Sequence, residues 1–356
     1  VDSNRTQNNG HNGGGIFARR TSLHLKSSSV TNNRTSRSGG GVYFINDYNN
    51  EPDSLIVERS IINKNNTLEY GAGIYTAIYK GRISLINTVL SNNRAVSSDG
   101  KTYYTSALHD AYNTQDTITV VNSTIVSNTG SYAMAINGNN DYDRIRNTII
   151  WHNKNVQYVN TSTGEITYRN ESTNMGASHF NYSNVEHSSS VNPGETNINS
   201  DPAFIDYVNG DYRLSASSPS LGTGTRDGAP SVDLVGNVRP NPVGSNPDMG
   251  AYESELGTRT TGNIFYVNTS GNDLNEGTIN KPFLTIQRGM DRAYNGDTLI
   301  VYPGTYTESV DFKTKNVVLG SRYLTTSDTT YRDSTIINGG DGFHEHPTQG
   351  LLDMMS

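Results

Sequence analysis

A six-residue motif that recurs along the first half of the chain constrains the fold more than any other feature. It consists of Ser or Thr, any residue, an aliphatic residue, any two residues and then Asn. Five copies end at Asn33, Asn65, Asn93, Asn128 and Asn153, at intervals of 25 to 35 residues, and a degenerate sixth copy ends at Ser188. Repeats of this length are typical of solenoids, in which each repeat packs against its neighbours.

Each repeat contains further short β segments. A glycine-rich stretch followed by apolar residues precedes several copies of the motif, at 13–17, 39–43 and 71–75. An alternating stretch, such as 54–58 or 83–87, lies between the two elements. Alternation of this kind indicates short strands. We therefore predict three short strands per turn, stacked at the roughly 4.7–4.9 Å spacing of a sheet, with equivalent positions forming inward rows.

Composition agrees with an elongated fold that has a thin core. Only 33% of the chain is hydrophobic and 17% is charged, while Gly alone contributes 35 residues. An ordinary globular chain is roughly 45–50% apolar. Because Gly, Asn, Ser and Thr are poor helix formers, a helical protein is excluded.

The repeats of residues 1–200 resemble the right-handed parallel β-helix of the pectin-lyase-like superfamily. The resemblance rests on the Gly-x-Gly-Ile-Tyr string at 71–75 and on the five spaced Asn residues. It implies that these Asn residues form a structural ladder at one corner. There, an Asn side chain can bond the next turn, and Asn also tolerates a left-handed corner conformation.

Residues 201–256 have a different character. They contain Asp-Pro-Ala-Phe at 201–204, Gly-Asp-Tyr-Arg-Leu at 210–214 and Asp-Met-Gly-Ala-Tyr-Glu at 248–253. This order resembles the choice-of-anchor Q segment that closes many bacterial surface β-helices. The resemblance implies a cap over the exposed last turn, since an open sheet edge promotes aggregation. Four carboxylates of the segment are candidate calcium ligands or turn residues: Asp201, Asp211, Asp233 and Asp248.

A linker at 257–263 precedes a new start at 264–356. Residues 264–320 resemble the amino-terminal opening of parallel β-helix proteins, in which a short amphipathic helix caps the first turn. The apolar face of Ile286, Met290 and Ala293, after Pro282, predicts that helix near 282–294. The fold class is therefore all-β: a right-handed parallel β-helix with one short capping helix.

The order of body, closing cap, linker and opening cap leads us to expect the end of one β-helix followed by the start of another. Both outer ends would then be truncated parts of a longer protein, with neighbouring β-helix domains as partners. The alternative is one continuous structure in which 264–356 docks on the first helix.

Several function classes are excluded by what the sequence lacks. The chain contains no Cys, so thiolate metal sites and cysteine nucleophiles are excluded. We find no apolar run long enough to span a membrane. The net charge is −7, and the sequence shows no basic stripe, so nucleic acid is not an expected partner.

Catalytic candidates are weak. The resemblance to β-helix lyases implies calcium-binding carboxylates with an Arg or Lys base. One charged cluster has suitable residue types: Asp141, Asp143, Arg144 and Arg146. A solvated loop is the simpler interpretation of this cluster, and we find no glycoside hydrolase signature.

We therefore expect an extracellular or cell-surface module of a large bacterial protein, with a structural, adhesive or glycan-binding role and without catalysis. Its partner would be a polysaccharide or cell-surface glycan. The first alternative is a calcium-dependent lyase, or a glycoside hydrolase, acting on an acidic polysaccharide. The second is a self-assembling fibre subunit.

Overall fold

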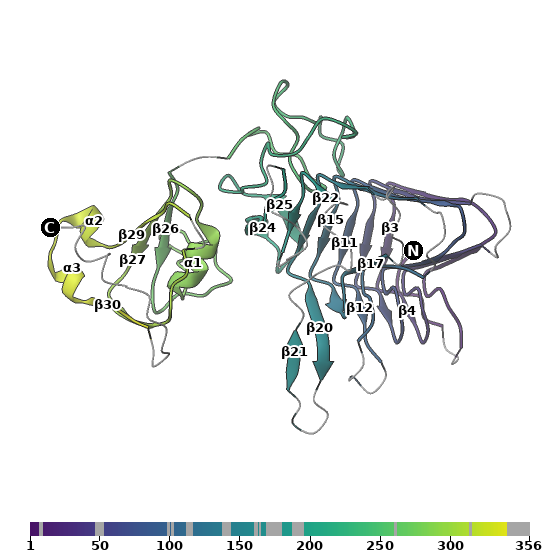
Figure 1. The fold of residues 1–356 in the computed structure, drawn as a ribbon, viewed down its shortest axis with the longest axis horizontal. Coiled ribbons are helices and arrows are strands. Elements are labelled where there is room, and N and C mark those ends of the chain that lie inside the picture. The colour runs from purple at the N-terminus through teal and green to yellow at the C-terminus, as the bar shows by residue number, and fades with distance from the viewer. Residues whose placement is uncertain are drawn as a thin grey trace. The chain divides into compact units, whose positions relative to one another are not determined.

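The computed structural model describes residues 1–6, 10–46, 53–97, 100, 103–111, 117–136, 144–159, 163, 165–168, 180–186, 196–259, 262–312 and 315–339. It confirms the expected fold class, because the strands form a parallel β-solenoid of about 8 turns (Figure 1). The chain divides into two compact units, Val1–Arg259 and Thr260–Ser356. No helix in the described ranges is long and apolar enough to cross a membrane.

Four sheets build the first unit, and successive turns lie next to each other in every sheet. Sheet I contains β1 (Ile16–Arg19), β5 (Val42–Ile45), β9 (Ile74–Ala77), β13 (Leu108–Asp110) and β17 (Met134–Ile136). Sheet II contains β2 (Leu23–Lys26), β6 (Ser54–Glu58), β10 (Arg82–Ile86), β14 (Thr117–Val121), β18 (Arg144–Arg146) and β22 (Phe180–Asn181). Sheet III contains β3 (Ser29–Thr31), β7 (Ile61–Asn63), β11 (Val89–Ser91), β15 (Thr124–Val126), β19 (Ile149–Trp151) and β23 (Asn184–Val185).

Sheet IV adds a fourth strand to each turn, whereas the sequence predicts three. It contains β4 (Arg34–Thr35), β8 (Asn66–Thr67), β12 (Arg94–Ala95), β16 (Thr129–Gly130) and β20 (Lys154–Val159). Strand β20 continues into an antiparallel pair with β21 (Ile166–Tyr168). Most strands of sheet IV have two residues, which is too short to produce an alternating pattern in the sequence.

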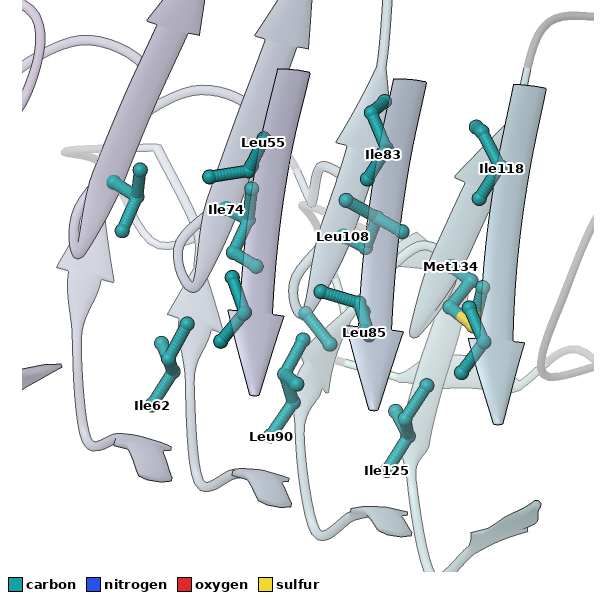
Figure 2. Packing of buried hydrophobic residues seen from close by; sticks show 14 of the residues in the cluster. Leu55, Ile62, Ile74, Ile83, Leu85, Leu90, Leu108, Ile118, Ile125 and Met134 are labelled. Atoms are coloured by element: carbon teal, nitrogen blue, oxygen red, sulfur yellow. The ribbon is translucent and has the colours of Figure 1, made fainter. Parts of the chain in front are cut away.

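A continuous apolar core fills the solenoid. Each turn adds one or two buried aliphatic side chains per strand, as Leu55, Ile83 and Ile118 do in sheet II (Figure 2). Val30, Ile62, Leu90, Ile125 and Ile150 form the equivalent inward row of sheet III. Because identical positions stack from turn to turn, a small number of apolar residues per turn suffices, which explains the low hydrophobic fraction.

Residues 201–256 pack along the side of the solenoid, on the outer face of sheet III. They begin with an antiparallel pair, β24 (Phe204–Asp206) and β25 (Asp211–Leu214). Their apolar side chains form one cluster with outward residues of sheet III: Val89, Val126, Ile149, Trp151, Phe204, Tyr212, Leu214, Leu221, Leu234, Met249 and Ala251. The expected cap over the last turn is therefore wrong for most of this segment. The last turn is bonded mainly by residues 197–200, which pair with Ser183 and with Asn184 of β23. Within 201–256, Ser220 also bonds this turn, since its hydroxyl accepts a hydrogen bond from Asn184 Nδ2 at 3.0 Å.

The second unit has its own core. Strands β26 (Ile264–Val267), β27 (Thr298–Val301) and β29 (Val318–Ser321) form one parallel sheet, and β28 (Gly304–Thr307) pairs with β30 (Thr335–Asn338). Helix α1 (Ile286–Arg292) buries Ile286 and Met290 in this core. Two further single-turn helices, α2 (Tyr323–Thr326) and α3 (Thr330–Asp333), are not predicted by the sequence.

Charged side chains from neighbouring segments hold both ends of α1. The Glu308 carboxylate accepts hydrogen bonds from the backbone N–H groups of Ile286 and Gln287, at 2.8 Å each. The Lys315 Nζ donates to three carbonyls at the other end, including those of Met290 and Ala293. An anion at the start and a cation at the end both match the helix dipole.

Candidate functional site

The five Asn residues of the sequence motif stack as a buried ladder at the corner between sheets III and IV. In each step, the backbone N–H and the side-chain Nδ2 of one Asn both donate to the Oδ1 of the Asn in the next turn. For Asn65 and Asn93 these distances are 3.1 and 3.0 Å, and the steps from Asn33 to Asn153 repeat the pattern. Each Nδ2 after the first also donates to a carbonyl one turn back, as Asn65 does to Val30 at 2.9 Å. These amides therefore have a structural role.

The left-handed conformation at this corner belongs to the residue before each ladder Asn. Asn32, Lys64, Asn92, Ser127 and His152 have φ between 53° and 56°, and the ladder residues themselves do not. The reason proposed from the sequence for Asn at the ladder position, tolerance of positive φ, therefore applies to its neighbour. The ladder position instead requires an amide that can donate and accept at once.

A second polar row lies one corner earlier and uses the Ser or Thr that opens each motif. Ser28 N donates to Ser60 Oγ at 3.0 Å, Thr88 N donates to Ser123 Oγ at 3.1 Å, and Thr148 N donates to Ser183 Oγ at 3.2 Å. The hydroxyls in turn donate to backbone carbonyls, as Ser60 does to Glu58. Sequence reasoning recorded the motif position but gave it no role, although its regular recurrence was the available signal.

Four corner residues in successive turns fasten residues 201–256 to the solenoid. We call this segment the side clasp. The side chains of Arg59, Asn87, Asn122 and Asn147 each donate to a carbonyl of the side clasp, at 3.5, 2.6, 3.0 and 2.8 Å respectively. All four have positive φ between 45° and 51°, which turns them outward at the corner between sheets II and III. The side clasp therefore ties four turns together from one side.

Two of the calcium candidates belong to a buried ionic cluster inside the side clasp. Arg239 Nε lies 3.2 Å from Glu253 Oε2, and both side chains are fully buried. Asp233 Oδ1 accepts hydrogen bonds from three consecutive backbone N–H groups, and Asp248 accepts one on each oxygen, from Gly222 and Ser254.

The pKa values in this cluster reflect its burial. Desolvation raises the pKa of Glu253 to about 7 and that of Asp248 to about 6, against the opposing effects of Arg239 and backbone N–H groups. Desolvation also lowers the pKa of Arg239, with the neighbouring carboxylates opposing the shift. Carboxylate oxygens that accept N–H bonds are occupied, so the cluster is built to hold the chain in place.

The other two calcium candidates lie in separate local turns. The Asp201 carboxylate accepts a hydrogen bond from the N–H of Ala203 at 2.8 Å. Asp211 binds the guanidinium of Arg213 through two hydrogen bonds, which hold the pKa of that carboxyl below its usual value. Within the described ranges, no group of three or more Asp, Glu or His side chains is arranged to hold a metal ion.

The catalytic candidates do not form a site in the part of the chain that the structure describes. Asp141 and Asp143 lie outside the described residues. Arg144 and Arg146 belong to β18, where Arg144 is exposed. Arg146 instead forms an ion pair with Asp227 of the side clasp at 2.5 Å, so its charge contributes to fastening that segment.

An aromatic row runs along the outer face of sheet I. The rings of Phe17, Tyr43 and Tyr75 stack at 5.4 and 4.9 Å between centroids, and His109 continues the row at 5.5 Å. Tyr70 covers His109 at 4.5 Å, and burial lowers the pKa of this imidazole to about 4. Rings stacked in this way direct their faces at one another and their edges outward. The row therefore stabilises the sheet more readily than it stacks on sugars.

Comparison with known proteins adds little to these observations. No family model matches the chain, and no solved structure matches it. It is 42% identical over 53 residues to the uncharacterized protein YwoF of Bacillus subtilis (strain 168), which is 15% of this chain and 11% of that protein. It is 69% identical over 26 residues to the aspartate carbamoyltransferase catalytic subunit of Caldanaerobacter subterraneus subsp. tengcongensis (7% and 9% of the two chains). The chain thus spans about a tenth of the length of these curated relatives.

Proposed function

We propose that the chain is a structural module of a bacterial extracellular or cell-surface protein, a stiff stalk that can also serve adhesion or glycan binding. The observation that carries this proposal is the side clasp, which bonds the corner residues Arg59, Asn87, Asn122 and Asn147 of four successive turns. A solenoid turn contacts only its two neighbours, so a segment that spans four turns increases cooperativity along the axis.

Two features support a mechanical role over a catalytic one. The buried carboxylates of the side clasp are bound by backbone N–H groups, as Asp233 and Asp248 show. The polar rows at two corners likewise use their hydrogen bonds to join turns. The resemblance to surface β-helices supports a location outside the cell.

Force spectroscopy on the whole chain, held at its two ends, tests the proposal. Asn87→Gly, Asn122→Gly and Asn147→Gly together remove four clasp bonds, two of them between Asn147 and Thr225. Gly keeps the left-handed backbone. We expect the first unit to unfold in one step at a lower force than the unmodified chain. The matched control is Asn32→Gly, Lys64→Gly and Ser127→Gly, which changes three left-handed residues at the corner between sheets III and IV. It spares Asn92 and His152 of that corner, which contact Tyr212 and Tyr207 of the side clasp.

An equal loss of force in the control, or no loss in the clasp variant, would contradict the mechanical role. A second assay addresses catalysis directly. The chain is incubated with polyuronates and calcium, and unsaturated products and new reducing ends are followed. We expect no turnover. If turnover occurs and a single Asp→Ala substitution abolishes it, the chain is a lyase and the proposal of a structural stalk is wrong.

A further inference from the structure

A line of positive charge runs along the outer face of sheet IV and its corner. Register places Arg5 beside Arg34, Arg34 beside Asn66, and Asn66 beside Arg94. The line continues from Arg94 through Thr129 to Lys154. In the turn where uncharged Asn66 occupies this position, the positive charge comes from Lys64, which lies two residues earlier at the corner. We call Arg5, Arg34, Lys64, Arg94 and Lys154 the cationic row.

The cationic row cannot be recognised in the sequence because its successive members stand 29 to 60 residues apart. Sequence reasoning found no basic stripe, and the solenoid creates one by stacking distant residues. All five side chains are exposed. In the described part of the chain, no acidic side chain forms an ion pair with any of them.

The carboxylates of Asp2 and Glu69, which stand within five residues of the cationic row in the sequence, accept hydrogen bonds from neutral groups. The carboxylate of Asp2 accepts hydrogen bonds from Thr31 and Asn32, each at 2.8 Å, and these bonds lower its pKa. Glu69 accepts a hydrogen bond from the hydroxyl of Ser38. Neither carboxylate forms an ion pair with a member of the cationic row among the described residues, so the row presents five exposed cations to solvent.

We propose that the cationic row binds an extended acidic polysaccharide laid along the solenoid axis. Four of its members follow one line of paired positions across the turns, and Lys64 lies beside that line at the corner. Successive turns along the line are separated by the strand spacing of roughly 4.7–4.9 Å. A linear polyanion can meet several cations at once on such a track, and it releases counterions as it binds. The proposal rests on the glycan-binding part of the proposed function and names the class of glycan, whereas the force measurement tests the stalk separately.

Other polyanions fit the row less well. Phosphates of duplex DNA wind around their axis, so a row one residue wide reaches only a few of them. Single-stranded nucleic acids bind through aromatic stacking in addition to charge, and the row contains no aromatic residue. An anionic membrane is a broad surface, which favours a wide basic patch with apolar anchors over a single line.

Binding of a fluorescent oligogalacturonate to the whole chain tests the proposal. The row variant is Arg34→Gln, Lys64→Gln and Arg94→Gln. A control with the same change in net charge is Lys26→Gln, Lys80→Gln and Arg82→Gln, which lie on or beside sheet II. We expect the row variant to weaken binding by about tenfold or more and to flatten its salt dependence between about 50 and 200 mM.

The control should bind within about twofold of the unmodified chain. Arg34→Lys with Arg94→Lys should retain binding, because charge at those positions is what the polymer contacts. The proposal is overturned if the unmodified chain fails to bind at about 50 mM salt, or if a neutral galactan binds equally well. An equal loss in the control also overturns it, as does tighter binding of duplex DNA or phosphatidylserine vesicles through the same row.

Discussion

Replacing one ladder amide should destabilise the first unit strongly, and Asn65→Ala is the cleanest case. The side chain of Asn65 makes four buried hydrogen bonds: two that its Oδ1 accepts from Asn33, and two that its Nδ2 donates to Val30 and Asn93. Its loss leaves the buried N–H of Asn33 without its acceptor. Asn33 Nδ2 keeps a bond to Val1, and Asn93 Oδ1 keeps the backbone N–H of residue 65.

The magnitude follows from these contacts. A buried donor left unpaired costs about 1–3 kcal/mol, and each of the other lost bonds costs about 0.5–1.5 kcal/mol. We therefore expect the free energy of unfolding to fall by about 4 kcal/mol. A unit of this size changes its midpoint by roughly 2–4 °C per kcal/mol, so the melting temperature should fall by about 8–16 °C.

Urea unfolding measures this change, because the chain has a single tryptophan, Trp151, which lies between sheet III and the side clasp. The control is Asn63→Ala, which removes a half-buried amide two residues away on the outer face of β7. We expect the control to lose less than about 1 kcal/mol, as outward substitutions usually do. If Asn65→Ala cost no more than Asn63→Ala, the ladder would not stabilise the stack.

Three further predictions concern the side clasp and the stacking of turns. Since burial raises the folded pKa of Glu253 to about 7 and that of Asp248 to about 6, above the ordinary range of carboxyl groups, folding favours their protonated forms. The melting temperature should fall as pH rises from about 4 to 7, and Glu253→Gln should reduce that slope; stability rising with pH across this window would refute the assignment. Calcium or a chelator should leave the melting temperature unchanged, because Asp233 and Asp248 already bind N–H groups; a calcium-dependent rise measured by calorimetry would refute this. Gly41→Ala should destabilise by about 1–3 kcal/mol, since a Cβ there would lie 2.6 Å from the carbonyl oxygen of Gly73. Gly339→Ala meets nothing and should be neutral when calorimetry follows the unfolding of the whole chain.

The sequence predicts the inward half of the solenoid well, because each turn repeats the same spacing. Val30, Ile62 and Leu90 recur at one position of the motif, and each stands in the core row. The Asn ladder follows from the same spacing, since residues in equivalent positions of stacked turns must meet. In a solenoid, the spacing of the repeat in the sequence therefore also shows which residues of neighbouring turns are in contact.

The contacts on the outer faces of the sheets could not be predicted from the repeat spacing. Ile61, Val89 and Ile149 stand directly before inward residues, at a motif position to which the sequence analysis assigns no role. In the structure these three side chains pack against the side clasp. In these three-residue strands, two consecutive apolar residues were the available signal that both faces of sheet III are covered. Sheet IV was missed because two residues show no period.

The role of the candidate calcium ligands could not be predicted from the sequence, for a different reason. Sequence shows which carboxylates exist, but not which backbone N–H groups surround them. Asp233 and Asp248 resemble calcium ligands by type, and only the folded side clasp shows that N–H donors occupy them. The cationic row was missed because its residues are distant in sequence and become neighbours only when the turns stack.

The stacking register is the central claim, and a distance between spin labels tests it most directly. The chain has no Cys, so Arg34→Cys and Lys154→Cys can be labelled cleanly. These positions lie in one row of sheet IV, four strand steps apart, although 120 residues separate them in sequence. Pulsed electron resonance should give a narrow distribution near about 19 Å, which is four spacings of roughly 4.7–4.9 Å. A broad distribution, or one centred beyond about 30 Å, would contradict the parallel stack.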